Sequence, residues 1–565
     1  MSFFKVRASR RAPFGIGPVR AWLLTVLILF TRGAAFSVDF NTSGDPETLA
    51  KSIVDSMTDE QALAQTFMLG WVGATPSPLI IDWIRDRNIG GVKIFGWNTG
   101  DTRMLAETVG ALQKNAVTGA FNLPLLVATD QEGGWIRHVK GSTSETPGNM
   151  AIGASGYPKD AYLSGYYIGR ELALLGINMN FAPAVDLYTN QDSTLIGPRA
   201  FSSDPVQVGI LGAAFVKGQA AAGIIATAKH YPGHGDTDLD SHGVLPRINA
   251  PLEALWDREL APYRLLAKEG IPAIMSGHLA FPNTPAASTP ASLSSWFLKD
   301  ILRDRIGFTG LIITDDLMMN GATMSAGSLS RAAKQALLAG NDIIMLSKTP
   351  GLEDPIWTTL VTAMAQEGDF RERVRDAARR VVEVKLIYLR GDTAVPLIPD
   401  LVRVEQELPD PEGSAFFLDL AARSVTLVQG QDQFPLSPEK AGKVLLAGQY
   451  LDFFSIGKAA YPGATGYWYS AAGGTRELVR YAQGVDTVIF CLSDEAGLPF
   501  LQALRNLGKR IIVFSVLSPV YLQKTGWADG AIAVYSYAPE SFTAGFSFML
   551  GRIPAQGRLP FSLGL

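Results

Sequence analysis

Eight short apolar runs, separated by longer stretches with helical spacing, constrain this chain of 565 residues more than any other feature of its sequence. Runs that are apolar on both faces are typical of strands buried in a parallel sheet. The intervening stretches, such as "PLIIDWIRDRN" and "LSRAAKQALLAG", have the spacing of amphipathic helices. Eight strands that alternate with helices predict a TIM-like (β/α)8 barrel. The runs cover residues 66–73, 90–98, 124–130, 177–186, 223–233, 271–279, 310–317 and 341–348.

The chain is longer than one hydrophobic core usually spans, which indicates a second domain. Residues 392–413 are rich in proline and acidic residues and are typical of a linker. Five more apolar runs alternate with helical stretches after the linker and predict a smaller open αβα sandwich. We therefore expect a barrel domain over residues 40–391, a linker over 392–413 and the sandwich over 414–565. The second domain has no glycine-rich phosphate loop, so we do not expect it to bind a nucleotide.

The N-terminal segment has the composition of an export signal. Residues 1–36 carry six basic residues and no acidic one, and the ten-residue apolar run "AWLLTVLILF" precedes a group of small residues. This pattern predicts a signal peptide over residues 1–35 and a protein exported to the periplasm or the extracellular space. Ten apolar residues are too few for a regular membrane span, so we expect no stable span in the mature chain. An uncleaved N-terminal anchor is the alternative.

Charge and cysteine content exclude some partners. The chain has a net charge of −4, and the mature chain is more acidic because the signal carries six of the basic residues. We expect no nucleic-acid partner, since phosphates repel an acidic protein. Cys491 is the only cysteine, so no intrachain disulfide forms, and its apolar surroundings predict a buried position. Nothing in the sequence indicates an organic cofactor or an oligomeric state.

Polar residues stand at the carboxyl end of nearly every apolar run. In a parallel barrel these ends converge on one rim, where active sites form. The rim candidates are Asp130, Asp186, Lys229, His230, His278, Asp315 and Lys348.

The segment "KHYPGHGDTDLDSH", residues 229–242, holds three of the five histidines of the chain. Three histidines, His230, His234 and His242, are enough to bind a metal ion. The proline and glycine residues between them, however, prevent the helix that usually presents such ligands. A loop folded round a metal remains one interpretation. The interpretation we favour is proton transfer, because a carboxylate such as Asp240 beside His242 sets the tautomer of an imidazole that donates and accepts protons near neutral pH. The third interpretation is an Asp–His hydrogen bond with a purely structural role.

The same segment closely resembles the signature loop of the β-N-acetylglucosaminidases of glycoside hydrolase family 3. The C-terminal "YSYAPESFTAGFSFMLGRIPAQGRLPFSL" resembles the end of that family's second domain, so the resemblance extends from about residue 45 to 563. Further blocks resemble the family in the same order: "ATDQEGGWIR" (128–137), "INMNFAPAVDL" (177–187), "IGPRAFSSDP" (196–205), "IMSGHLAFP" (274–282) and "IITDDLMMNGAT" (312–323).

The resemblance implies a retaining exo-glycosidase that removes a terminal non-reducing β-linked N-acetylglucosamine or related N-acetylhexosamine. Asp315, the first aspartate of the "TDD" block, would be the nucleophile and would form a covalent glycosyl-aspartate. His242 would be the acid/base, oriented and supported by Asp240. Most retaining glycosidases use a second carboxyl group in that role. From the residues alone Asp315 and Asp316 are equivalent, since either could cap the following helix.

The resemblance also implies which residues bind the sugar. Asp130 would accept hydrogen bonds from sugar hydroxyls. Arg199, Lys229 and His230 would surround the same ring. Each of these residues has an alternative role as an ion-pair or buried polar partner at the rim.

Some candidate positions stay open between two roles. The family places an arginine where this chain has His138, and Arg137 stands one position earlier, so either residue could supply that contact. Trp135 could stack on a sugar or pack. Asp186 and His278 could line the pocket or support it.

We expect a secreted exo-β-N-acetylglucosaminidase that acts on peptidoglycan fragments or chitooligosaccharides without a metal or a cofactor. One alternative in the same family is a β-glucosidase or β-xylosidase whose acid, Asp494 or Glu495, comes from the second domain. Another is an N-acetylglucosaminide phosphorylase, because a neutral histidine tolerates a phosphate dianion better than a carboxylate does. The alternative of another class is a non-catalytic, wall-associated sugar-binding protein.

Overall fold

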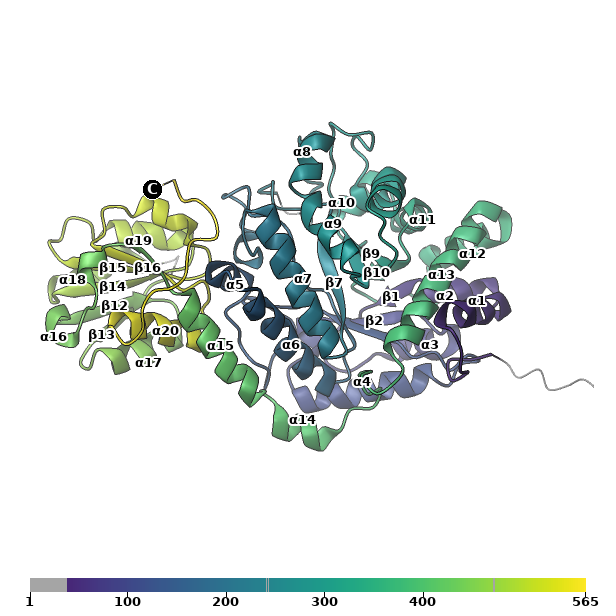
Figure 1. The fold of residues 1–565 in the computed structure, drawn as a ribbon, viewed down its shortest axis with the longest axis horizontal. Coiled ribbons are helices and arrows are strands. Elements are labelled where there is room, and N and C mark those ends of the chain that lie inside the picture. Colours follow the sequence, from purple (N-terminus) through teal and green to yellow (C-terminus); the bar gives the residue numbers. More distant parts are fainter. Residues whose placement is uncertain (1–37, 240, 242, 471–472, 565) are drawn as a thin grey trace, which may run out of the picture. The chain divides into compact units, whose positions relative to one another are not determined.

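The eight apolar runs form the eight strands of a closed parallel barrel (Figure 1). The computed structural model describes residues 38–239, 241, 243–470 and 473–564. The strands follow one another round the barrel in the order β1-β10-β9-β8-β7-β6-β3-β2, so the predicted fold is confirmed. Their bounds are β1 (Phe67–Leu69), β2 (Gly91–Ile94), β3 (Leu126–Thr129), β6 (Met179–Asn180), β7 (Ile225–Tyr231), β8 (Ala273–Ser276), β9 (Leu311–Asp316) and β10 (Ile343–Leu346).

Helices cover the outside of the barrel, and side chains that the sequence makes recognisable cap several of them. Ser77 caps the helix over "PLIIDWIRDR", and Ser328 caps the helix over "LSRAAKQALLA", each by accepting a backbone N–H bond. The helices are α1 (Pro46–Ser56), α2 (Asp59–Gln65), α3 (Pro78–Arg87), α4 (Thr102–Ala116), α5 (Asn149–Ser155), α6 (Pro158–Leu174), α7 (Pro205–Ala221), α8 (Leu252–Asp257), α9 (Leu260–Lys268), α10 (Asn320–Ala326), α11 (Leu329–Ala339), α12 (Pro355–Gln366) and α13 (Gly368–Tyr388), with the π-helical segment η4 (Trp296–Arg305) and the 3-10 turns η1 (Gly96–Asn98), η2 (Gly197–Arg199) and η3 (Ala291–Leu293).

Two barrel strands contain an extra residue near their carboxyl ends. Between β7 and β8 the register shifts after Ala228, and between β10 and β9 it shifts before Asp316. Neighbouring residues of a regular strand point to opposite faces, whereas a bulge redirects a side chain. The bulges therefore let consecutive residues of β7 and of β9 reach the same space.

The second sheet has six strands in the order β11-β16-β15-β14-β12-β13. Successive residues of β14 alternate between two cores: Val488 and Phe490 pack on the α18–α19 side, and Ile489 and Cys491 on the α17–α20 side (Figure 1). The elements are β11 (Thr426–Gln429), β12 (Val444–Gly448), β13 (Thr465–Trp468), β14 (Thr487–Leu492), β15 (Arg510–Ser515) and β16 (Gly530–Ala533), with α16 (Pro438–Ala441), α17 (Leu451–Ala460), α18 (Thr475–Gln483), α19 (Leu498–Gln502), α20 (Pro539–Met549), η5 (Gln431–Gln433), η6 (Glu495–Gly497) and η7 (Pro519–Lys524).

The predicted open αβα sandwich is confirmed, with one strand more than the sequence indicates. The five predicted runs correspond to β11, β12, β14, β15 and β16. The sixth strand, β13, lies at the sheet edge with three of its four residues exposed. An exposed edge strand needs no continuous apolar run, which is why the apolar pattern misses it.

The region predicted as a linker is partly helical. The helix α14 (Leu401–Glu407) lies inside it, and α15 (Pro411–Ser424) begins there. Arg423 of α15 forms an ion pair of 2.8 Å with Asp160 of α6, and all residues from Asp39 onward belong to one compact unit. The exact domain boundaries stay predictions.

The predicted signal peptide, residues 1–35, lies outside the described residues. Among the described helices, none combines the length and the apolar character that a membrane crossing requires.

Candidate active site

A cavity of about 510 Å³ lies at the carboxyl ends of the barrel strands and is here called the barrel cavity. Its volume is in the range of small-ligand sites. Both members of the Lys229–His230 pair and of the Asp315–Asp316 pair line it, as the two bulges allow. The predicted sugar-site residues that line the barrel cavity are Asp130, His138, Arg199, Lys229, His230 and Asp315.

Asp130, which follows β3, is held between two lysines. Its Oδ1 lies 2.5 Å from Nζ of Lys229 and its Oδ2 lies 2.7 Å from Nζ of Lys93. Burial raises the pKa of the Asp130 carboxyl, but the two ammonium groups outweigh it and hold the pKa well below its usual value. Asp130 is thus an ionised acceptor at the cavity wall.

Glu132 fixes the two other cations of the barrel cavity. Its carboxylate accepts two hydrogen bonds from Arg199, of 2.9 and 2.8 Å, and lies 2.7 Å from Nζ of Lys229. The side chain of Glu132 is only 1% exposed, so this bidentate pair is shielded from water. Arg199 and Lys229 therefore present charge in a fixed orientation.

His230 has both ring nitrogens engaged. Nδ1 lies 2.7 Å from Oδ2 of the buried Asp186, and Nε2 lies 3.1 Å from the guanidinium of Arg199. Because arginine only donates, Nε2 is the acceptor and Nδ1 carries the hydrogen toward Asp186. This arrangement leaves His230 no free nitrogen for a metal, and the described residues contain no cluster of three His, Cys, Asp or Glu side chains suited to hold one.

The carboxylates of Asp315 and Asp316 differ in their hydrogen bonds and in the direction of their pKa shifts. Oδ1 of Asp316 accepts the backbone N–H groups of Met318 and Ser347 at 3.0 and 3.1 Å, as a capping side chain does. Burial raises the pKa of Asp316. Burial also acts to raise the pKa of Asp315, but the basic groups around it, His230 foremost, outweigh burial and lower it. Of the two, Asp315 is the carboxylate suited to a nucleophile.

The structure distinguishes between His138 and Arg137. Arg137 belongs to a short hairpin, β4 (Gln131–Gly133) and β5 (Ile136–Arg137), and its guanidinium pairs with Glu145 at 2.9 Å, outside the barrel cavity wall. His138 lines the cavity, with Nδ1 at 3.3 Å from Nζ of Lys93. Burial and the Lys93 charge lower the pKa of His138 to about 4. Since the ammonium donates, Nε2 of His138 carries the ring hydrogen.

Asp240 and His242 lie outside the described residues, but contacts fix the position of Gly235, before them, and of Ser241, between them. Gly235 stands so close to Leu187 that a Cβ there would lie 1.5 Å from the Leu187 carbonyl oxygen, so only glycine fits. Ser241, between the two predicted residues, lines the barrel cavity, and its carbonyl oxygen accepts the backbone N–H of Gly321 at 3.3 Å.

Two of the open candidates support the cavity. The buried carboxylate of Asp186 accepts three hydrogen bonds, two from His230 and one from the backbone N–H of His234. The buried ring of His278 contacts Ser292 at 2.7 Å and the carbonyl oxygen of Asp316 at 3.0 Å. Neither Asp186 nor His278 is part of the cavity lining.

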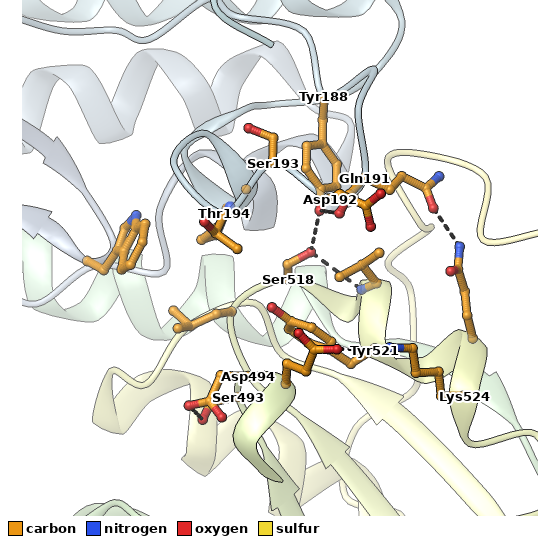
Figure 2. Close-up of a pocket in the computed structure, with 17 residues that line it drawn as sticks. Tyr188, Gln191, Asp192, Ser193, Thr194, Ser493, Asp494, Ser518, Tyr521 and Lys524 are labelled. Carbon is orange, nitrogen blue, oxygen red and sulfur yellow. Dashed lines mark hydrogen bonds and ion pairs between the residues drawn. The ribbon is translucent and has the colours of Figure 1, made fainter. Parts of the chain in front are cut away.

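A second cavity, of about 380 Å³, holds the remaining candidates. It lies between the loop after β6 and the loops after β14 and β15 of the second sheet (Figure 2). Trp135, Asp494 and Glu495 line this second cavity and not the barrel cavity.

Sequence reasoning missed Lys93 and Glu132. Lys93 lies in β2 with a side chain that is completely buried, and it also contacts the ring of Phe95. The signal was available, because a lysine inside "GGVKIFGWN" needs a partner if the strand is buried. Phe95 and Trp97 were missed as well; their rings stack at 4.5 Å beside the cavity that both line.

Comparisons with known proteins agree with the fold and the motifs. The model described as "Glycosyl hydrolase family 3 N terminal domain" matches residues 61–384. The chain is 37% identical over 289 residues to beta-hexosaminidase A of Pseudoalteromonas piscicida, which covers 48% of each chain. It is 29% identical over 447 residues to the beta-N-acetylglucosaminidase/beta-glucosidase of Cellulomonas fimi, which covers 75% of this chain and 74% of that one.

A solved structure resembles nearly the whole molecule. The glycoside hydrolase family 3 beta-N-acetylglucosaminidase from Paenibacillus sp. str. FPU-7 superimposes with a TM-score of 0.81 and 27% identity, over 90% of this chain and 99% of that chain. The alignment with the Pseudoalteromonas protein, in contrast, spans only about half the length of that relative, 48%.

Proposed function

Because the chain belongs to glycosyl hydrolase family 3, as its match over residues 61–384 shows, we propose that it is a retaining exo-glycosidase. It releases terminal β-linked N-acetylglucosamine, or a related N-acetylhexosamine, from the non-reducing end of peptidoglycan fragments or chitooligosaccharides. The observation that carries this proposal is the ionised carboxylate of Asp315 in one cavity with the ordered cluster of Asp130, Lys229 and Arg199. The names of the Pseudoalteromonas, Cellulomonas and Paenibacillus proteins support the sugar.

In the first step Asp315 attacks the anomeric carbon of the bound sugar. A bond forms between a carboxylate oxygen of Asp315 and that carbon, and the glycosidic C–O bond breaks with its electron pair on the leaving oxygen. His242 gives its proton to this oxygen, so the leaving sugar departs neutral. A covalent glycosyl-aspartate remains.

In the second step water releases the sugar. His242, now neutral, takes a proton from water while the water oxygen attacks the anomeric carbon and the ester bond to Asp315 breaks. The product keeps the β configuration. The motif that contains His242 supports its role, and so does Ser241, the residue before it, which lines the cavity. Asp240 orients the imidazole.

The charged cluster binds the sugar hydroxyls. Asp130 accepts, whereas Lys229, Arg199 and the Nε2–H of His138 donate. Since the cations are already paired with Asp130 and Glu132, they need little reorganisation when the substrate arrives. His230 lies beside Arg199 and also lines the cavity that holds the sugar.

The proposal is tested with nitrophenyl β-glycosides that differ only at C2, together with NMR of the product. We expect hydrolysis of the acetamido sugar at a kcat/KM at least tenfold above that of the C2-hydroxyl sugar, with the β anomer formed first. Formation of the α anomer would contradict a retaining mechanism. Added phosphate that yields sugar 1-phosphate would indicate phosphorolysis in place of hydrolysis.

A second candidate is a broader enzyme that also cleaves β-glucosides. The double name of the Cellulomonas fimi relative favours it. Equal kcat/KM values for the two C2 variants would establish it, and the same assay therefore decides between the two proposals.

A further inference from the structure

The second cavity lies beside the barrel cavity, and the proposed reaction does not use it. Figure 2 shows its two walls: Tyr188 and Gln191 come from the barrel loop, and Tyr521 and Lys524 come from the second sheet. Hydrogen bonds fasten the walls to each other, since the Tyr188 hydroxyl lies 3.2 Å from Oγ of Ser518 and Gln191 accepts from Gln523. These hydrogen bonds between the two walls hold the second cavity open in a defined shape.

The second cavity and the barrel cavity share a wall. Trp135 lines the second cavity and Ile136, the next residue, lines the barrel cavity. In the segment 194–199, which ends with η2, Thr194 and Pro198 line the second cavity, whereas Leu195 and Arg199 line the barrel cavity. The two cavities are therefore neighbours, and a ligand of several sugars that extends from the barrel cavity past this wall would reach the second one.

The lining of the second cavity suits a sugar ring. Trp135 is 38% exposed, so part of its ring is open to a ligand, and Tyr521 adds a second aromatic side chain. Aromatic side chains with a few polar groups are the usual lining of small-molecule sites. Ser193, a lining residue only 1% exposed, has a buried Oγ with no hydrogen-bond partner among the residues that the structure describes.

The charge of the lining selects against anions. Three carboxylates, those of Asp192, Asp494 and Glu495, face one cation, Lys524. Lys524 is already 3.1 Å from Glu495. The excess of negative charge repels a ligand that carries a carboxylate and leaves a neutral one unaffected.

We propose that the second cavity binds the leaving-group sugars of a neutral β-linked oligosaccharide, an inference that rests on the proposed glycosidase function. The substrate class that follows is a chitooligosaccharide of three or more units, in preference to a peptidoglycan fragment, whose leaving MurNAc carries a carboxylate on its lactyl group or, where a peptide is attached there, on the peptide. The second domain thereby contributes to substrate choice and not to proton transfer.

The test compares kcat/KM for chitobiose, chitotetraose and the disaccharide GlcNAc–MurNAc in the wild type, in Tyr521→Ala and in Tyr481→Ala. Tyr481 is the matched control, because it is an exposed tyrosine of the second domain that does not line the cavity. In the wild type we expect chitotetraose to exceed chitobiose by about 3- to 10-fold, the worth of one aromatic contact. Tyr521→Ala should remove that preference, and Tyr481→Ala should keep it.

Asp192→Asn tests the effect of charge, at a position in a turn where the side chain is exposed. It should lower the preference for chitobiose over GlcNAc–MurNAc by about 2- to 5-fold. A length preference equal in all three proteins, or a charge preference unchanged in Asp192→Asn, would overturn the inference. If the nitrophenyl sugar itself is not cleaved, the proposed function fails; if it is cleaved without any length preference, only the second cavity is refuted.

Discussion

The two neighbouring cavities hold their charges in different ways. In the barrel cavity, Asp130, Glu132, Arg199 and Lys229 pair within 3 Å, and their side chains are at most 16% exposed. In the second cavity the Glu495–Lys524 pair is 75% and 60% exposed. Charges in a low-dielectric site hold one another strongly, whereas exposed ones are screened by water. The difference indicates a rigid site for the sugar that reacts and an adaptable one for the sugars that leave.

The largest change in activity should come from the acid/base. Replacing His242 with alanine should slow substrates with a poor leaving group by about 10²–10⁴-fold, the usual worth of general acid catalysis. Substrates with an activated leaving group should lose less, because their leaving oxygen needs no proton. Rates on both classes measure this. Equal losses would mean that His242 is structural.

A glutamate-to-glutamine substitution in each cavity should have different effects on stability. Glu132→Gln leaves Arg199 and Lys229 buried without their carboxylate and should lower the free energy of unfolding by about 3–5 kcal/mol. Glu495→Gln removes an exposed pair and should change it by less than about 1 kcal/mol. Denaturant unfolding of both variants tests this, and similar losses would remove the distinction between the cavities.

Stability should fall as the pH is lowered through the titration of two buried histidines. Burial lowers the pKa of His138 and of His234 to about 4, from an ordinary value of 6.5. Between these values the unfolded chain binds more protons than the folded one, so unfolding becomes easier as the pH falls from about 6.5 to 4, by roughly 1–3 kcal/mol for each histidine. The carboxylates whose pKa is lowered, such as Asp186, add a loss only below that window, whereas the buried carboxyls whose pKa is raised, such as Asp316 and Glu171, act in the opposite direction.

The measurement is the free energy of unfolding at pH 7, 5.5 and 4.5. His234→Gln should flatten the dependence, because it removes one of the two groups. A pH dependence in His234→Gln equal to that of the wild type would show that the His234 imidazole binds a proton as readily in the folded protein as in the unfolded chain.

The smallest predicted effect concerns Lys93. Lys93→Met removes the ammonium beside His138, so the pKa of His138 should rise from about 4 toward its ordinary value, while burial keeps it lower. With only five histidines in the chain, NMR titration resolves it. Lys385→Met is the matched control: Lys385 is also a fully buried lysine, but its Nζ bonds to Gln65. An unchanged pKa of His138 in Lys93→Met would contradict the contact between the Lys93 ammonium and the His138 ring.

The sequence predicted the fold well and the site in part, for physical reasons. Apolar runs report burial, so they located all eight barrel strands but not the exposed edge strand β13. Strand alternation could not decide between Asp315 and Asp316, because a bulge lets both line the cavity. The charge partner of Asp130 on β2, Lys93, comes from 37 residues away and is visible only when the strands are placed.

The role of Asp315 is tested most directly by identifying the residue that a fluorinated N-acetylglucosaminyl donor labels. We predict one sugar on the peptide that contains Asp315, detected by mass spectrometry, and no label in Asp315→Asn, with Asp300→Asn on the surface as the control that labels normally. A label on another carboxylate, or none in an enzyme that retains the β configuration, would contradict the claim that Asp315 attacks the sugar.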